Sequence, residues 1–80
     1  HEALAGVLYL QGDLFGAREA LVTASRLGAP AWRVAYHLGL VAEGLGEPDE
    51  AVRHYRACLE RKSDHEPARV RLHGLTARRS

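Results

Sequence analysis

Two side chains near the middle of the sequence have the types and the spacing that could carry out chemistry. His54 and Cys58 stand four positions apart, which places an imidazole and a thiol on one face of a helix. Both groups bind zinc, and a thiolate beside an imidazole can also act as a nucleophile. A zinc site needs more ligands, however, and no third ligand stands nearby in the sequence. We therefore predict that Cys58 is a buried packing residue, that His54 faces solvent, and that neither binds a metal.

Other polar groups have simple structural interpretations. Asp49 and Glu50 follow a proline at the start of a helical pattern, where carboxylates stabilise the helix terminus and need not form an acid–base pair. His37 is the type of residue that can make a pH-sensitive contact, although a solvated histidine is the default. The sequence has no phosphate-binding loop and no glycine-rich nucleotide fingerprint. We predict a protein that is not an enzyme and has no catalytic, cofactor-binding or metal-binding residue.

The composition indicates one small domain with no general affinity for polyanions. The 80 residues are 46% apolar, and the formal net charge is +1. The single cysteine excludes an internal disulfide. Arginines crowd the C-terminal region, where we expect a solvated cap formed by Arg69, Arg71, Arg78 and Arg79.

The first residue and the hydropathy of the chain bear on whether it is part of a longer protein and whether it associates with a membrane. The chain begins with His1 and contains no methionine, from which we expect a segment of a longer protein or a processed form. No apolar run is long enough to cross a bilayer, and no stretch resembles a signal peptide. We expect no membrane partner and slightly favour a soluble, cytoplasmic protein, with the compartment left open.

Apolar residues recur with a helical period in five stretches. Glycines and prolines separate these stretches, and the expected helices cover about 2–11, 14–27, 30–44, 48–62 and 66–78. The residues expected to face inward are Leu4, Val7, Leu8 and Gln11 in the first helix; Leu14, Ala17, Leu21, Ala24 and Ser25 in the second; Val34, Ala35, Leu38, Val41 and Ala42 in the third; Ala51, Val52, Tyr55, Cys58 and Leu59 in the fourth; and Val70, Leu72 and Leu75 in the fifth. The sequence thus predicts an all-α domain.

The pattern matches itself when the chain is displaced by about 34 residues. Gly12 then falls on Gly46, and Leu72 falls on Leu38. The remaining matches pair Leu4-Ala5 with Leu38-Gly39, Ala17 with Ala51, Leu21 with Tyr55, and Ala24 with Cys58. Small residues at such positions let two helices approach closely, and large ones fill the space between them.

This motif resembles the tetratricopeptide repeat, a helix–turn–helix unit of about 34 residues. The resemblance implies antiparallel helix pairs stacked as a right-handed α-solenoid of five helices. Repeat one would occupy about 1–31, repeat two about 32–65, and a capping helix about 66–78. The chain departs from the family pattern where His1, Ala35 and Arg69 replace a large aromatic residue, and we expect Trp32 to compensate by packing between neighbouring helices.

The resemblance also implies a concave surface, formed by the first helix of each pair, that holds a peptide or a helix of a partner protein. The positions that would face it are Glu2, Gly6, Tyr9, Arg33, Tyr36, His37, Leu40, Glu43, Val70, Arg71 and Gly74. As partner-binding residues we predict Tyr9, Arg33, Tyr36, His37, Leu40, Glu43 and Arg71. Tyr36 and Leu40 form the expected exposed anchor, and the alternative is that Tyr36 packs against the adjoining helix. Only Arg71 matches the clamp with which some relatives grip carboxylate tails, so we do not expect this segment to bind chaperone tails.

Three functions follow in order of preference. The first is a protein-protein interaction module that binds a peptide or helix in the concave groove. The second is a structural spacer or self-association segment of a longer repeat array, with a homo-oligomer as the outcome. The third is an RNA-binding helical repeat, which ranks low because the period is 34 and the groove is charge-mixed, so we do not expect a nucleic acid partner.

Overall fold

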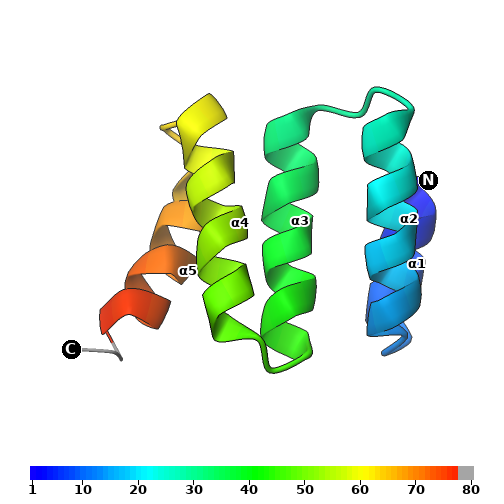
Figure 1. Ribbon diagram of the computed structural model, residues 1–80, viewed down its shortest axis with the longest axis horizontal. Helices are drawn as coiled ribbons and strands as arrows, with labels where there is room; N and C mark the ends of the chain where they lie inside the picture. Colours follow the sequence, from blue (N-terminus) through cyan, green and yellow to red (C-terminus); the bar gives the residue numbers. More distant parts are fainter. Residues whose placement is uncertain (78–80) are drawn as a thin grey trace.

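Five α-helices joined by short turns make up the part of the chain that the computed structural model describes, residues 1–77 (Figure 1). The helices are α1 (Glu2–Leu10), α2 (Leu14–Arg26), α3 (Ala31–Gly44), α4 (Pro48–Arg61) and α5 (Glu66–Ala77). No strand occurs in this range. The all-α class and the five helices are therefore confirmed. Pro30 precedes α3 as its N-cap and is not its first residue as expected.

Two turns of the same geometry end α1 and α3. Gly12 and Gly46 adopt positive φ angles of 83° and 74°, a conformation that glycine reaches without a steric penalty. The Gly12 N–H donates to the Tyr9 carbonyl at 3.0 Å, and the Gly46 N–H donates to the Glu43 carbonyl at 3.1 Å. The following residue in each turn donates to a carbonyl five positions earlier, at 2.8 and 2.9 Å. The two turns lie 34 positions apart, so the backbone reproduces the repeat spacing seen in the sequence.

The starts of α2 and α4 are stabilised in different ways. The Asp13 carboxylate accepts a hydrogen bond from the Gly16 N–H at 2.9 Å, which satisfies a free donor in the first turn of α2. Helix α4 begins with Pro48, and its first turn carries Asp49 and Glu50 at the positive end of the helix dipole. Both helices begin at the chain positions where the sequence predicts them to begin.

The apolar core consists of two clusters that meet at α3. One cluster joins α1, α2 and α3 through the buried residues Ala5, Ala17, Ala20, Leu21, Val34 and Val41. The other joins α3, α4 and α5 through the buried residues Ala35, Ala42, Ala51, Val52, Tyr55, Cys58, Ala68 and Leu75. Alanine is the commonest buried residue, so the helices approach one another closely. Trp32 is partly buried against the second cluster, which agrees with the packing role expected for it.

Some residues expected to face the core are exposed instead. Leu4 and Val7 are each 50% exposed, and Val70 is 63% exposed. Helix α1 packs mainly on α2, and this packing leaves Leu4 and Val7 half exposed. Gln11 and Ser25 are also exposed. The pattern missed Ala20 and Ala68, which take close-packed positions, whereas Ala5 is buried where the repeat match pairs it with Gly39.

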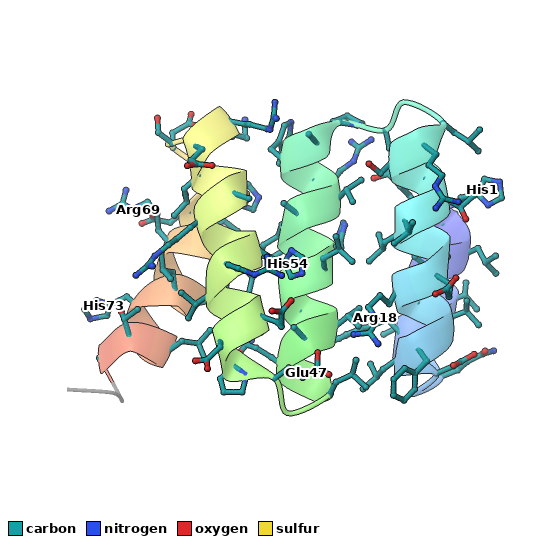
Figure 2. All side chains as sticks on the ribbon, in the orientation of Figure 1. His1, Arg18, Glu47, His54, Arg69 and His73 are labelled. Carbon is teal, nitrogen blue, oxygen red and sulfur yellow. The ribbon has the colours of Figure 1, made fainter. Side chains whose placement is uncertain are left out.

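The helices follow one another along the length of the molecule. Helices α1 and α2 lie at one end, α5 lies at the other, and α3 and α4 lie between them (Figure 1). An ion pair links α2 to the start of α4, where Arg18 and Glu47 point toward each other with 3.3 Å between Nη1 and Oε1 (Figure 2). The arrangement brings one side of α1, α3 and α5 to a common surface, which is where the sequence predicts the site.

Candidate functional site

A groove of about 350 Å³ lies between α1, α3 and α5, and we call it the α1–α3–α5 groove. The buried side chains of Ala5, Leu21 and Val41 form its floor. Around them the groove is lined by Glu2, Gly6, Tyr9, Leu10, Tyr36, His37, Leu40 and Arg71. Five of the seven residues predicted to bind a partner line this one groove: Tyr9, Tyr36, His37, Leu40 and Arg71.

The other two predicted residues lie in neighbouring hollows. Arg33 lines a shallow hollow between the start of α1 and the end of α2. Glu43 lines a hollow of about 260 Å³ that it shares with Arg71 and Gly74 of α5. Arg71 belongs to both this hollow and the α1–α3–α5 groove, so the two are adjacent along α5.

Glu2, which lines the groove, forms a bidentate ion pair with Arg33. The Arg33 guanidinium donates from Nε to Glu2 Oε1 at 2.6 Å and from Nη2 to Glu2 Oε2 at 2.9 Å. These hydrogen bonds hold the pKa of the Glu2 carboxyl below its usual range. The pair joins the first turn of α1 to the first turn of α3, and its charges compensate each other. Sequence reasoning placed both residues on the binding surface but did not pair them.

A second charged group is compensated in the last turn of α3. The Glu43 carboxylate accepts hydrogen bonds from the Tyr55 hydroxyl and from Arg71 Nη1, the latter at 3.1 Å. Burial, and then the nearby Glu43 carboxylate, raise the pKa of the Tyr55 hydroxyl, so it stays protonated and donates. Glu43 and Arg71 were both predicted as partner-binding residues, and they bind each other across α3 and α5.

His37 lies at the wall of the groove and is partly buried. Burial lowers the pKa of its imidazole below the usual value, although the nearby Glu2 carboxylate acts to raise this pKa and Arg33 to lower it. The ring is therefore neutral near pH 7. It lies 5.5 Å from the Tyr36 ring, centroid to centroid, so His37 presents an uncharged aromatic surface.

Tyr36 does not form the exposed anchor that we expected. Its ring is partly buried against the α3–α4–α5 cluster, 4.8 Å from the His65 ring and 6.0 Å from the Tyr55 ring. The alternative interpretation, that Tyr36 packs against adjoining elements, is therefore correct. Leu40 is also partly buried, and the two side chains share the wall of the groove.

The buried thiol has a different histidine beside it from the one suggested by sequence spacing. Cys58 Sγ lies 3.7 Å from His65 Nδ1, and His54 is partly buried and not fully solvent-facing as expected. His65 Nδ1 also accepts a hydrogen bond from the Ala68 N–H at 3.3 Å, so this imidazole caps the start of α5. A signal was present, because His65 directly precedes the Glu-Pro dipeptide that opens a helix.

Cys58 has the properties of a packing residue. It is fully buried, and burial raises the pKa of its thiol, which keeps the sulfur protonated and unreactive. Within residues 1–77, no three side chains among His, Cys, Asp and Glu come together in a way that could hold a metal ion.

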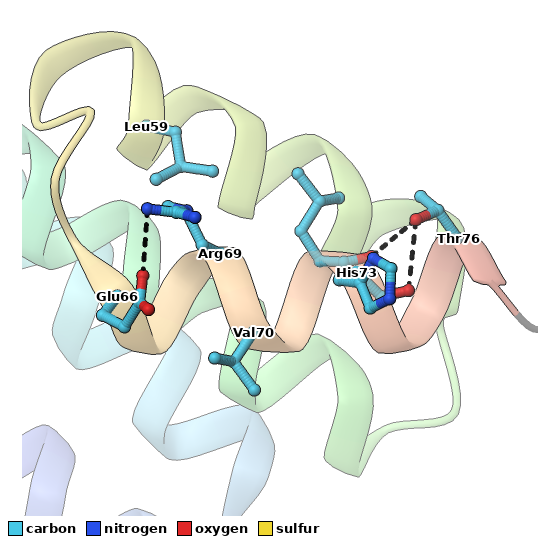
Figure 3. Close-up of a pocket in the computed structure, with 7 residues that line it drawn as sticks. Leu59, Glu66, Arg69, Val70, His73 and Thr76 are labelled. Atoms are coloured by element: carbon cyan, nitrogen blue, oxygen red, sulfur yellow. Dashed lines mark hydrogen bonds and ion pairs between the residues drawn. The ribbon is translucent and has the colours of Figure 1, made fainter.

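The outer side of α4 and α5 contains a separate hollow of about 490 Å³ (Figure 3). Leu59 of α4 and Leu72 of α5 give it an apolar floor, and Arg69 forms an ion pair with Glu66 at 3.1 Å across its rim. Figure 2 shows Arg69 and His73 projecting from this end of the molecule. Arg69 and Arg71 of the expected arginine cap thus have acidic partners, whereas Arg78 and Arg79 lie outside the described residues.

The chain matches no known family model, no curated protein and no solved structure. Among residues 1–77, no helix combines the length and the apolar character needed to cross a lipid bilayer. The structure itself thus defines the class, an all-α domain with a groove between three of its five described helices.

Proposed function

We propose that this chain is a protein-interaction module that holds a segment of a partner protein in the α1–α3–α5 groove. The observation that carries the proposal is the convergence of residues from α1, α2, α3 and α5 on one groove with a buried apolar floor. A concave apolar surface with a few polar groups at its edge is typical of a binding site. Aromatic and leucine side chains in its wall, such as Tyr9, Tyr36 and Leu40, supply contact area for a partner.

We further propose that the helices stack as a tetratricopeptide-like α-solenoid. Repeat one would be 1–31, repeat two 32–65, and the capping helix 66–78. The equivalent turns at Gly12 and Gly46, 34 positions apart, support this arrangement. The buried pairs at the same spacing also support it: Ala17 with Ala51, Leu21 with Tyr55, and Ala24 with Cys58. In such a solenoid the first helix of each antiparallel pair lines the concave side, and α1, α3 and α5 are those helices.

The charges of the groove favour a protein partner over RNA. A groove for RNA offers cationic side chains to the phosphates. Here Arg33 is paired with Glu2, and Arg71 is paired with Glu43. Binding phosphate would require these arginines to leave carboxylate partners, so we rank RNA below protein.

The proposal is tested with a displayed library of random peptides selected against the folded chain. Binders are then assayed against Leu40→Glu, which places a charge in the groove wall, and against Ser25→Glu. Ser25 is exposed on α2 and lies in none of the hollows described above, so Ser25→Glu is the control that adds the same charge. We expect Leu40→Glu to lose binding by about tenfold or more and Ser25→Glu to keep it. Equal binding to both variants would refute the groove as the binding site.

A second function, self-association, has an observation of its own in its favour. Six of the seven large hydrophobic residues exposed in the described range lie on or directly after α1 and α2: Leu4, Val7, Leu10, Phe15, Val22 and Leu27. Exposed apolar surface of this kind favours contact with another chain. Light scattering over a range of concentrations tests it, since a constant monomer mass would remove this candidate.

A further inference from the structure

The α1–α3–α5 groove is close to electrically neutral even though charged residues line it. Glu2 is held by two hydrogen bonds from Arg33, and Arg71 by Glu43. His37 adds no charge near pH 7, because burial lowers the pKa of its imidazole. A charged group of a partner would have to displace one of these ion pairs to find a counter-ion, at a cost in desolvation. The surface is therefore complementary to an uncharged, apolar partner surface.

Two glycines of the chain indicate that another molecule can approach the helices closely at this groove. Six of the eight have a reason within the fold, either a positive φ or a side chain packed where a Cβ would stand: Gly12, Gly16, Gly28, Gly39, Gly44 and Gly46. The two others, Gly6 and Gly74, lie inside helices α1 and α5, and a Cβ at either would meet no atom within 4 Å. A glycine inside a helix costs about 0.5–1 kcal/mol relative to alanine, so the fold gains nothing from them.

Both of these glycines face the site. Gly6 lines the α1–α3–α5 groove, and Gly74 lines the adjacent hollow beside Glu43. Arg71 belongs to both hollows and connects them along α5. The open space over Gly6 and Gly74 lets a backbone from another molecule come nearer than any larger side chain would allow.

The backbone chemistry of the groove distinguishes a helical occupant from an extended one. The walls are helices, whose backbone N–H and C=O groups are already bonded within each helix. An extended peptide would bury its own amide groups against apolar side chains with few polar partners, which is costly. A helix satisfies its backbone internally and presents only side chains.

We infer that the occupant of the groove is an amphipathic helix of a partner protein, which lays an uncharged apolar stripe across the groove and packs its backbone closely against Gly6 and Gly74. This inference rests on the proposed function and specifies the partner that the site accepts. Leu40 would insert between side chains of the stripe, and the Tyr36 ring would form the wall beside it, in the manner of other helix-in-groove complexes.

The test uses a displayed library built on one helical peptide of about 18 residues, or five turns, whose stripe positions are randomised. Selected peptides are measured against the wild-type chain, Gly6→Phe, and the control Glu19→Phe, which adds the same ring at an exposed position of α2 outside the hollows described above. A Cβ at position 6 meets no atom within 4 Å and the site is open, so we expect circular dichroism to show both variants folded. A proline is then placed in the middle of each selected peptide to break its helix.

We expect stripes of uncharged apolar residues, affinity lowered by about tenfold or more in Gly6→Phe, little change in Glu19→Phe, and loss of binding on proline insertion. Selected stripes rich in charged residues, or binding that survives the proline, would overturn the inference while leaving the groove as the site. Peptides that bind Gly6→Phe as well as they bind the wild type would overturn the proposed function itself.

Discussion

The ring of Tyr55 lies directly against the backbone of Gly39, so that a Cβ on residue 39 would overlap it. Tyr55 is fully buried between α3 and α4, and its hydroxyl reaches Glu43 one turn further along α3. The pair holds α3 and α4 at a short distance. The absence of a side chain at Gly39 is therefore a packing requirement.

Gly39→Ala is expected to destabilise the fold. The added methyl group must displace the Tyr55 ring or separate two helices, and overpacking of this kind costs about 1–3 kcal/mol. Gly6→Ala is the matched control, because the site is open and the substitution should add up to about 1 kcal/mol through helix propensity. Urea unfolding measures both. An unchanged or raised stability in Gly39→Ala would contradict the packing described here.

Ala51 makes a similar test in α4. It is fully buried and matches Ala17 at the repeat spacing. Ala51→Leu should lower the free energy of unfolding by about 1–3 kcal/mol, because three additional carbons have no space in the α3–α4–α5 cluster. Val52→Ala, which removes volume from the same cluster, should also destabilise, by roughly 1–3 kcal/mol. An unchanged melting midpoint for Ala51→Leu would count against the repeat register.

The stability of the protein should fall as the pH drops below about 6.5. Burial lowers the pKa of His37 and of His54, so the unfolded chain binds more protons than the folded chain between the lowered values and 6.5. Their contribution is complete above the unfolded pKa and is lost as the pH falls toward the folded pKa. The pKa of Glu2 is also lowered, and its contribution is lost only in the acid range below its usual value of 4.5.

Thermal melts between pH 7.5 and 5 measure this effect. In His54→Gln the decrease should be smaller, since one of the two neutral imidazoles is removed. A variant whose profile follows that of the wild type would show that His54 does not contribute. An increase in stability on acidification would contradict the burial of both rings.

The sequence predicted the helices well because their ends depend on local chemistry. Gly12 and Gly46 end α1 and α3 through a positive φ, and Pro48 starts α4, and each of these signals is readable one residue at a time. The groove residues were instead placed by the resemblance to the tetratricopeptide repeat, which implies that the first helix of each pair lines a concave surface.

Which side chains pair with each other within the site depends on the rotation of each helix about its axis and on the distances between helices. The periodicity of the sequence does not specify either. Glu2 and Arg33 are far apart in the chain, and their pairing requires the actual approach of α1 to α3. His65 lies in a turn, so no helical face placed it beside Cys58 and Tyr36. The exposure of Leu4 and Val7 on α1 depends on which elements pack against that helix, and no local sequence pattern specifies this packing.

Tyr36 shows how packing and binding can be separated at one residue of the groove. Its ring contacts the rings of His65 and Tyr55, and its hydroxyl interacts with Arg71 at the edge of the groove. Tyr36→Phe should keep those ring contacts and leave stability within about 0.5 kcal/mol. Tyr36→Ala should lower the free energy of unfolding by about 2 kcal/mol or more, because it empties a partly buried aromatic site.

Binding and stability measured on both variants separate the role of the Tyr36 ring from that of its hydroxyl. If Tyr36→Phe binds selected peptides like the wild type while Tyr36→Ala loses both stability and binding, the ring shapes the groove and the hydroxyl is dispensable. If Tyr36→Phe alone loses binding with its melting midpoint unchanged, the hydroxyl contacts the partner directly, and the apolar character that we assign to the occupant would need a polar group opposite Arg71. A Tyr36→Ala variant as stable as the wild type would show that the ring does not pack on α4 and α5, contrary to the contacts described above.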